Sequence, residues 1–137
     1  MKETIIKELK KVELKNPILV EGFPGLGMVG SIATKYLVKK LNAKKIAFLY
    51  SPHFPYHVIV NNKGGARLLR GEFYFLKIEN SQNDLIFLTG DSQAQTIEGQ
   101  FEVANSILDF VEKKKVKTII TIGGFRNEVE GDPKVVA

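Results

Sequence analysis

Three glycines at the spacing of a dinucleotide-binding loop are the clearest chemical signal in the sequence. Gly25, Gly27 and Gly30 lie between a short apolar run at residues 18–20 and a stretch with helical periodicity, where the dinucleotide fingerprint belongs. That fingerprint also needs an acid about 20 residues later to hold the ribose hydroxyls. The next apolar run ends at residues 49–52 without one, and the first acid after it is Glu72. We therefore predict no dinucleotide site and no cofactor.

A phosphate loop of the P-loop type is not supported either. Gly22 and Gly27 have its separation, but Met28 and Val29 follow where a lysine and a hydroxyl residue are needed. Anion binding at the helix start stays open on dipole grounds alone. We favour a structural interpretation, in which a tight turn lets the following helix lie close to a sheet. The residues of this predicted turn are Gly22, Pro24, Gly25, Gly27 and Gly30.

Other reactive side chains give weaker signals. His53 and His57 are the only histidines, and the acid-free segment around them supplies no third ligand, so we predict no metal site. No serine lies in a nucleophile-elbow motif. Asp91 and Glu98 could share acid and base work, but we favour a turn-bonding role for Asp91 and a helix-dipole role for Glu98. We predict no catalytic residue.

If a small ligand does bind, it should lie at the carboxyl ends of the strands, as in open α/β sheets. The segments expected there are residues 22–30, 51–56, 90–95 and 123–127. An enzyme of the nucleoside phosphorylase or hydrolase type is the alternative that such a pocket would support. The candidate lining residues are Gly25, Gly27, Ser51, Asp91, Gln93, Gly123 and Gly124.

Composition places these residues in one globular domain spanning 1–137. The 137 residues are 44% hydrophobic and 26% charged, without cysteine, and no apolar run approaches the length of a membrane span. We expect a cytoplasmic protein. The net charge of +5 is uneven, because no acid occurs between Gly22 and Gly71. This basic segment could face an acidic protein or a nucleic acid, but solvated lysines explain it more simply, and nucleic acid is not the expected partner.

The elements needed to position these residues alternate along the chain. We predict strands near 4–14, 18–20, 46–50, 84–90 and 118–122, short antiparallel pieces at 58–60 and 71–78, and two helices. Residues 4–14 fit an edge strand or a short helix, and we favour the strand. The pattern indicates an α/β layered sheet. The apolar positions expected for the first helix are Met28, Val29, Ile32, Ala33, Tyr36, Leu37 and Leu41, and those for the second are Phe101, Ala104, Ile107, Leu108 and Val111.

Four ordered blocks of the sequence resemble the PAC2 family, the archaeal and bacterial relatives of proteasome assembly chaperone 2. They are residues 16–30, 89–95, 98–104 and 119–125. The resemblance implies a three-layer mixed sheet with helices on both faces, similar to purine nucleoside phosphorylase. It also implies a non-enzymatic, homo-oligomeric chaperone that holds proteasome α subunits and uses no cofactor.

The carboxyl end departs from the family pattern. Members that dock onto the proteasome can end in a hydrophobic residue, a tyrosine and one more residue, whereas this sequence ends Val135, Val136, Ala137. Family members also usually run longer, and residues 134–137 read as the start of a further element. We therefore expect the N-terminal part of a longer family member.

Overall fold

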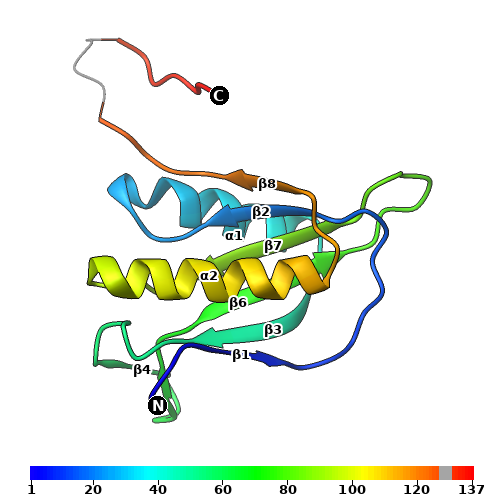
Figure 1. The fold of residues 1–137 in the computed structure, drawn as a ribbon. Helices are drawn as coiled ribbons and strands as arrows, with labels where there is room; N and C mark the ends of the chain where they lie inside the picture. Colours follow the sequence, from blue (N-terminus) through cyan, green and yellow to red (C-terminus); the bar gives the residue numbers. More distant parts are fainter. Residues whose placement is uncertain (127–130) are drawn as a thin grey trace.

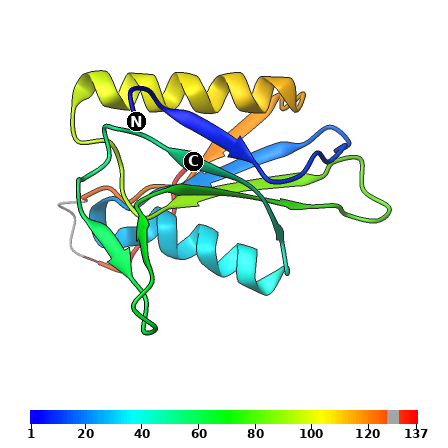
Figure 2. The ribbon, with the colours of Figure 1, turned by 90° about the horizontal axis from the view of Figure 1, so that it is seen from below.

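A computed structural model describes residues 1–126 and 131–137 as a sheet between two helices. Helix α1 covers one face of the sheet and helix α2 the other (Figures 1 and 2). Asn127, which sequence analysis included in the last strand-end segment, lies outside the described residues. The elements are β1 Ile5–Glu8, β2 Ile18–Gly22, the 3-10 turn η1 Leu26–Met28, α1 Val29–Lys40, β3 Lys44–Tyr50, β4 Val58–Val60, β5 Ala66–Leu68, β6 Gly71–Leu76, β7 Leu85–Gly90, α2 Ile97–Lys113 and β8 Thr118–Thr121.

The main sheet is mixed and has six strands, in the order β1-β3-β6-β7-β2-β8. β7, β2 and β8 are parallel, and β1, β3, β6 and β7 are joined by antiparallel ladders. α2 connects β7 to β8, as a crossover between parallel strands requires. The predicted mixed α/β sheet with helices on both faces is confirmed. The edge strand predicted near residues 4–14 is confirmed for β1, Ile5–Glu8, which pairs only with β3 and carries Lys7, whereas residues 9–14 form no strand.

The insertion between β3 and β7 differs from the sequence prediction. β4 pairs with β5, a strand that sequence analysis missed, and the two form a separate hairpin. The segment from Gly71 instead enters the main sheet as β6 between β3 and β7. The Asn61 side chain closes the hairpin turn by accepting hydrogen bonds from the amides of Lys63 and Gly65. This local Asx bonding satisfies the turn without help from the main sheet.

The main core lies between the sheet and α2. Phe73 of β6 and Phe110 of α2 pack with ring centroids 4.7 Å apart, in the tilted geometry that aromatic pairs prefer. Thr96 caps α2, because its hydroxyl accepts a hydrogen bond from the Gly99 amide at 3.0 Å. The other side chains of this core include Leu19, Ile46, Leu49, Ile86, Leu88, Val103 and Val111.

The apolar stripe predicted for α2 is only partly correct. Val111 is buried, but Phe101 and Leu108 are 68% and 49% exposed, and Val103 and Phe110 are buried in their place. The apolar residues of α2 lie on two sides of the helix. The sheet covers the side that carries Val103 and Phe110, and Phe101 and Leu108 belong to the second series. The second series faces the side of β8, the edge strand, where no described strand or helix continues the sheet.

Candidate functional site

A cleft of about 300 Å³ lies between α2 and the parallel strands β2 and β8. Its walls are mostly apolar side chains, among them Leu19, Phe23, Ile107 and Ile119. The polar groups that reach it are Glu21, Gln93, Gln100 and Thr121. The cleft runs along β2 and β8 from Leu19 and Ile119 to Glu21 and Thr121. One end of it thus reaches the carboxyl ends of the parallel strands, the position at which open α/β sheets bind ligands.

Glu21 is the one ionisable group among the lining residues. Strand alternation places it on the same face of β2 as Leu19, toward α2, and opposite Thr121 of β8. Burial raises the pKa of the Glu21 carboxyl, although a hydrogen bond from the Phe23 amide at 2.8 Å opposes this shift. A carboxyl with a raised pKa can exchange a proton or bond a polar ligand atom at higher pH than a solvated acid.

A second hollow adjoins the cleft and shares Glu21, Phe23, Gln93 and Thr121 with it. Gly25, Gly30, Gly123 and Gly124 form its floor and rim. The Gln93 side chain donates a hydrogen bond to the carbonyl of Pro24 at 2.6 Å, which ties the loop after β7 to the glycine turn. Sequence analysis predicted that Gly25, Gln93, Gly123 and Gly124 share one strand-end region, and the structure brings these four together.

The glycines of the turn are packed against backbone. A Cβ on Gly22 would lie 2.2 Å from the carbonyl oxygen of Gly30, and a Cβ on Gly30 would lie 2.2 Å from that of Ile122. A Cβ on Gly124 would lie 2.4 Å from the carbonyl oxygen of Leu26. Gly27 has a different role, because its φ of 61° is a left-handed conformation. These contacts support the structural interpretation of the turn.

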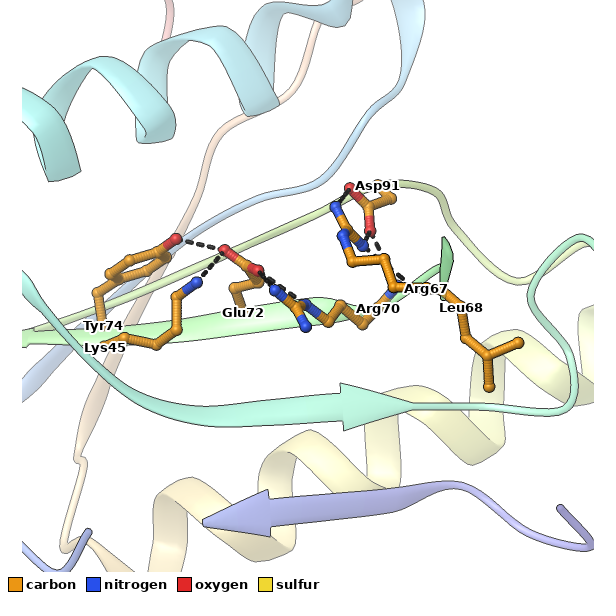
Figure 3. Close-up of polar contacts among 7 residues, drawn as sticks. All are labelled: Lys45, Arg67, Leu68, Arg70, Glu72, Tyr74 and Asp91. Atoms are coloured by element: carbon orange, nitrogen blue, oxygen red, sulfur yellow. Dashed lines mark hydrogen bonds and ion pairs between the residues drawn. The ribbon is translucent and has the colours of Figure 1, made fainter. Parts of the chain in front are cut away.

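Three of the predicted lining residues line neither the cleft nor the second hollow, namely Gly27, Ser51 and Asp91. Asp91 accepts two hydrogen bonds from the Arg67 guanidinium, at 2.6 and 3.1 Å, and a third from the Arg70 amide (Figure 3). Burial alone would raise the pKa of Asp91, but these hydrogen bonds outweigh it and lower the pKa below its usual range. Asp91 is thus a partner in an ion pair outside the cleft, and Glu98 is exposed in the first turn of α2. The acid and base pair considered from the sequence is therefore not formed.

The Arg67–Asp91 pair borders a chain of charges along the sheet. Arg70 and Lys45 both contact the Glu72 carboxylate, at 2.7 and 3.0 Å, and Tyr74 donates a hydrogen bond to it (Figure 3). Burial raises the pKa of Glu72, but the bonds from Tyr74, Lys45 and Arg70 outweigh this and lower it. Each of these side chains is engaged by an opposite charge or a hydrogen bond, so we assign the network a structural role.

Ser51 is buried and belongs to a cluster that fastens the N-terminus. Its hydroxyl is hydrogen-bonded to the Thr4 hydroxyl at 2.8 Å and accepts a hydrogen bond from the His53 amide at 3.1 Å. The His53 ring and the Thr4 amide contact the two carboxylate oxygens of Glu102, at 3.0 and 2.7 Å. Hydrogen bonds from Thr4 and His53 lower the pKa of Glu102 to about 2. Because Ser51 is bonded to the backbone of His53 and not to its ring, this cluster is not a nucleophilic triad.

Sequence reasoning missed Glu21, Phe23 and Thr121 as cleft residues. A usable signal was present for Glu21, since it is a lone acid in an aliphatic strand and shares the face of Leu19. Thr121 could be placed only from the register between β2 and β8.

Within residues 1–126 and 131–137, no three His, Asp or Glu side chains lie close enough together to hold a metal ion. No described helix is long and apolar enough to cross a membrane.

Comparison with known proteins adds a consistent result. A model of the PAC2 family matches residues 19–137. An uncharacterized protein of Methanocaldococcus jannaschii, MJ1210, is 31% identical over 126 residues, which are 91% of this chain and 48% of that protein.

Solved structures agree with the sequence matches. The crystal structure of Pyrococcus furiosus PbaB, an archaeal proteasome activator, is 41% identical with a TM-score of 0.90, and the match covers 96% of this chain and 56% of that chain. P. furiosus PbaA, an archaeal homolog of proteasome-assembly chaperone, is 26% identical with a TM-score of 0.61, over 92% of this chain and 52% of that one. The chain thus spans about half the length of these relatives.

Proposed function

Because this chain belongs to the PAC2 family, we propose that it is a non-enzymatic protein that binds proteasome α subunits through its surface. The observation that carries the proposal is the likeness to PbaB, with 41% identity and a TM-score of 0.90 over 96% of the chain. PbaB is an archaeal proteasome activator, and PbaA is an archaeal homolog of proteasome-assembly chaperone. The proteasome is common to both relatives.

The proposal extends to properties that accompany this function. We propose a cytoplasmic homo-oligomer that works without a cofactor, in which residues 1–137 form one domain of the purine nucleoside phosphorylase type. The packing of the glycine turn supports the absence of a cofactor there. Backbone atoms occupy the space beside Gly22 and Gly30, so these two glycines leave no open cradle for a ligand.

The cleft supports a second candidate function. Glu21, with its raised pKa, lies at the carboxyl ends of parallel strands beside Thr121 and Gln93, so a nucleoside-like ligand could find a carboxyl and an amide there. This reading corresponds to a nucleoside phosphorylase or hydrolase. It is weaker than the first, because Asp91 and Ser51, two groups that it relied on, are bonded outside the cleft.

Binding and thermal stability distinguish the two functions. The purified chain is mixed with recombinant proteasome α subunits and with assembled core particles of an archaeal proteasome, and complex size and peptide hydrolysis are followed. We expect a larger complex to form at physiological salt. If the chain binds neither the α subunits nor the core particles, the proposal is refuted. A panel of nucleosides, nucleotides and phosphate should leave the melting temperature unchanged. A ligand at a hundred times its Kd adds about 2.7 kcal/mol of stability, so tight binding would be readily seen.

A further inference from the structure

Helix α1 begins at a residue that is poorly suited to its position. Met28 occupies the cap position, where serine, threonine, aspartate or asparagine is preferred, and its side chain forms no capping hydrogen bond within the described residues. The first turn of α1 also contains no acid. Helix α2 differs, because Thr96 caps it and Glu98 lies in its first turn. Contacts with other parts of the chain must therefore set where α1 begins.

Met28 also has a left-handed backbone. Its φ is 57°, directly after Gly27 with a φ of 61°. This conformation costs free energy for a residue with a Cβ, because the Cβ comes close to the following carbonyl oxygen. The other non-glycine residues with positive φ in the described chain are three asparagines, which tolerate it, and Lys115, which follows the end of α2, where left-handed residues are common. Met28 is thus the strained residue of this group.

Contacts from two other segments hold the turn before α1. The Gln93 side chain donates a hydrogen bond to the Pro24 carbonyl at 2.6 Å, and the Gln100 side chain donates one to the Gln93 side-chain oxygen at 3.3 Å. Gly124 lies so close to the Leu26 carbonyl oxygen that an added Cβ would be 2.4 Å from it. A strained backbone persists only where its surroundings determine it. The loop between β7 and α2 and the segment after β8 supply these surroundings.

Gln93 is the one of these contacts that can open locally. Its bond joins a side-chain amide to a single carbonyl and is exposed, so a change of rotamer can break it. Gly124 has no side chain that could move. Gln93 also lines both the cleft and the second hollow, so it lies at the boundary between them.

We propose that Gln93 is a latch that holds a strained turn, residues 24–28, in one of two positions. In the latched position Gln93 is bonded to the Pro24 carbonyl and Met28 keeps its left-handed backbone. In the released position the Gln93 amide leaves this carbonyl, Met28 returns to a negative φ, and the boundary between the cleft and the second hollow opens. This device goes beyond the proposed function and does not depend on it.

Hydrogen exchange at single amides, measured by NMR, tests the latch. The Met28 amide is bonded to the Gly25 carbonyl at 2.9 Å, so its exchange reports opening of the turn. The Leu41 amide is bonded to the Leu37 carbonyl at 2.9 Å and reports on the far end of α1. In Gln93→Ala we expect roughly fivefold faster exchange at Met28, the effect of one lost hydrogen bond, and no change at Leu41.

Two matched controls accompany this variant. Gln95→Ala truncates the same type of side chain in the same loop and leaves the bond from its own amide to the His53 carbonyl in place, so exchange at Met28 should not change. Met28→Asn tests the strain, because asparagine tolerates a left-handed backbone, and it should raise the protection of the amide at residue 28 by roughly a factor of two or more. Leu26→Asn changes a neighbouring residue without positive φ and should not raise this protection.

The measurements refute the latch in three ways. If Gln93→Ala and Gln95→Ala exchange equally fast at Met28, Gln93 does not hold the turn. If Gln93→Ala accelerates exchange at Met28 and Leu41 by the same factor, the variant opens by global unfolding and there is no separate released position. If Met28→Asn gives no more protection than Leu26→Asn, the turn is not strained and has no second position to return to.

Discussion

Substitution of Gly22 by alanine tests whether the glycine turn is a packing device. The added methyl would lie 2.2 Å from the Gly30 carbonyl oxygen and 2.3 Å from the Thr34 hydroxyl. Because the first of these atoms is backbone, no change of rotamer relieves the clash, and α1 must move away from β2 by about 1 Å to restore van der Waals contact. The methyl thus acts on the whole interface between the helix and the sheet.

The expected cost follows from two opposing terms. Overpacking of this kind typically destabilises by about 1–3 kcal/mol. Replacing a glycine in a strand by alanine recovers about 0.5–1 kcal/mol, since the unfolded chain loses freedom. Because the clash is with backbone, the overpacking cost should lie near the top of its range, at about 3 kcal/mol. We therefore expect a net loss of about 2 kcal/mol in the free energy of unfolding, measured by urea denaturation, with a fall in melting temperature of roughly 6–10 °C.

Gly123 provides the control for this experiment. No atom lies within 4 Å of a Cβ built on Gly123, and its backbone has no positive φ. We expect Gly123→Ala to change stability by less than about 0.5 kcal/mol. Equal stabilities for Gly22→Ala and Gly123→Ala would refute the packing role of the turn. A loss of nucleoside binding without a loss of stability would instead indicate a ligand cradle.

Three further substitutions test other parts of the structure. Asp91→Asn removes the ion pair with Arg67 and should cost about 1 kcal/mol at neutral pH by urea denaturation. The pKa of Asp91 is lower in the folded state than in the unfolded state. The stability that this carboxylate contributes is therefore present above its unfolded-state pKa and is lost as pH falls through its folded-state pKa. The stability of Asp91→Asn should thus depend less on pH below about 4 than that of the unmodified chain. Thr34→Val should raise stability by about 1 kcal/mol, because the buried Thr34 hydroxyl has no hydrogen-bond partner among the described residues; a loss of stability would contradict this. Glu102→Gln removes the charged acceptor of the Thr4 amide, so hydrogen exchange at Thr4 should become faster, and unchanged exchange would show that the cluster does not hold the N-terminus.

Local pattern was sufficient for the order and type of most elements. Strand periodicity at β2, β7 and β8 and the turn residues before α1 predicted an α/β layered sheet, because these signals depend only on neighbours in the chain. The same reasoning placed Gly25, Gln93, Gly123 and Gly124 at one edge, since the carboxyl ends of parallel strands lie together. These features are properties of the sequence itself.

Tertiary contacts decided which sides of the helices are buried and where the polar groups lie. The apolar periodicity of α1 is a fact of the sequence, but Ile32 and Tyr36 are exposed, because the helix packs on β2 through Gly30 and Thr34, which lie against Gly22. Asp91 left the expected pocket because Arg67, on the β4–β5 hairpin, offers it a bidentate partner. Glu21 entered the cleft because β2 lies between β7 and β8 under α2. Each outcome depends on contacts between residues distant in sequence, whose geometry a local pattern does not contain.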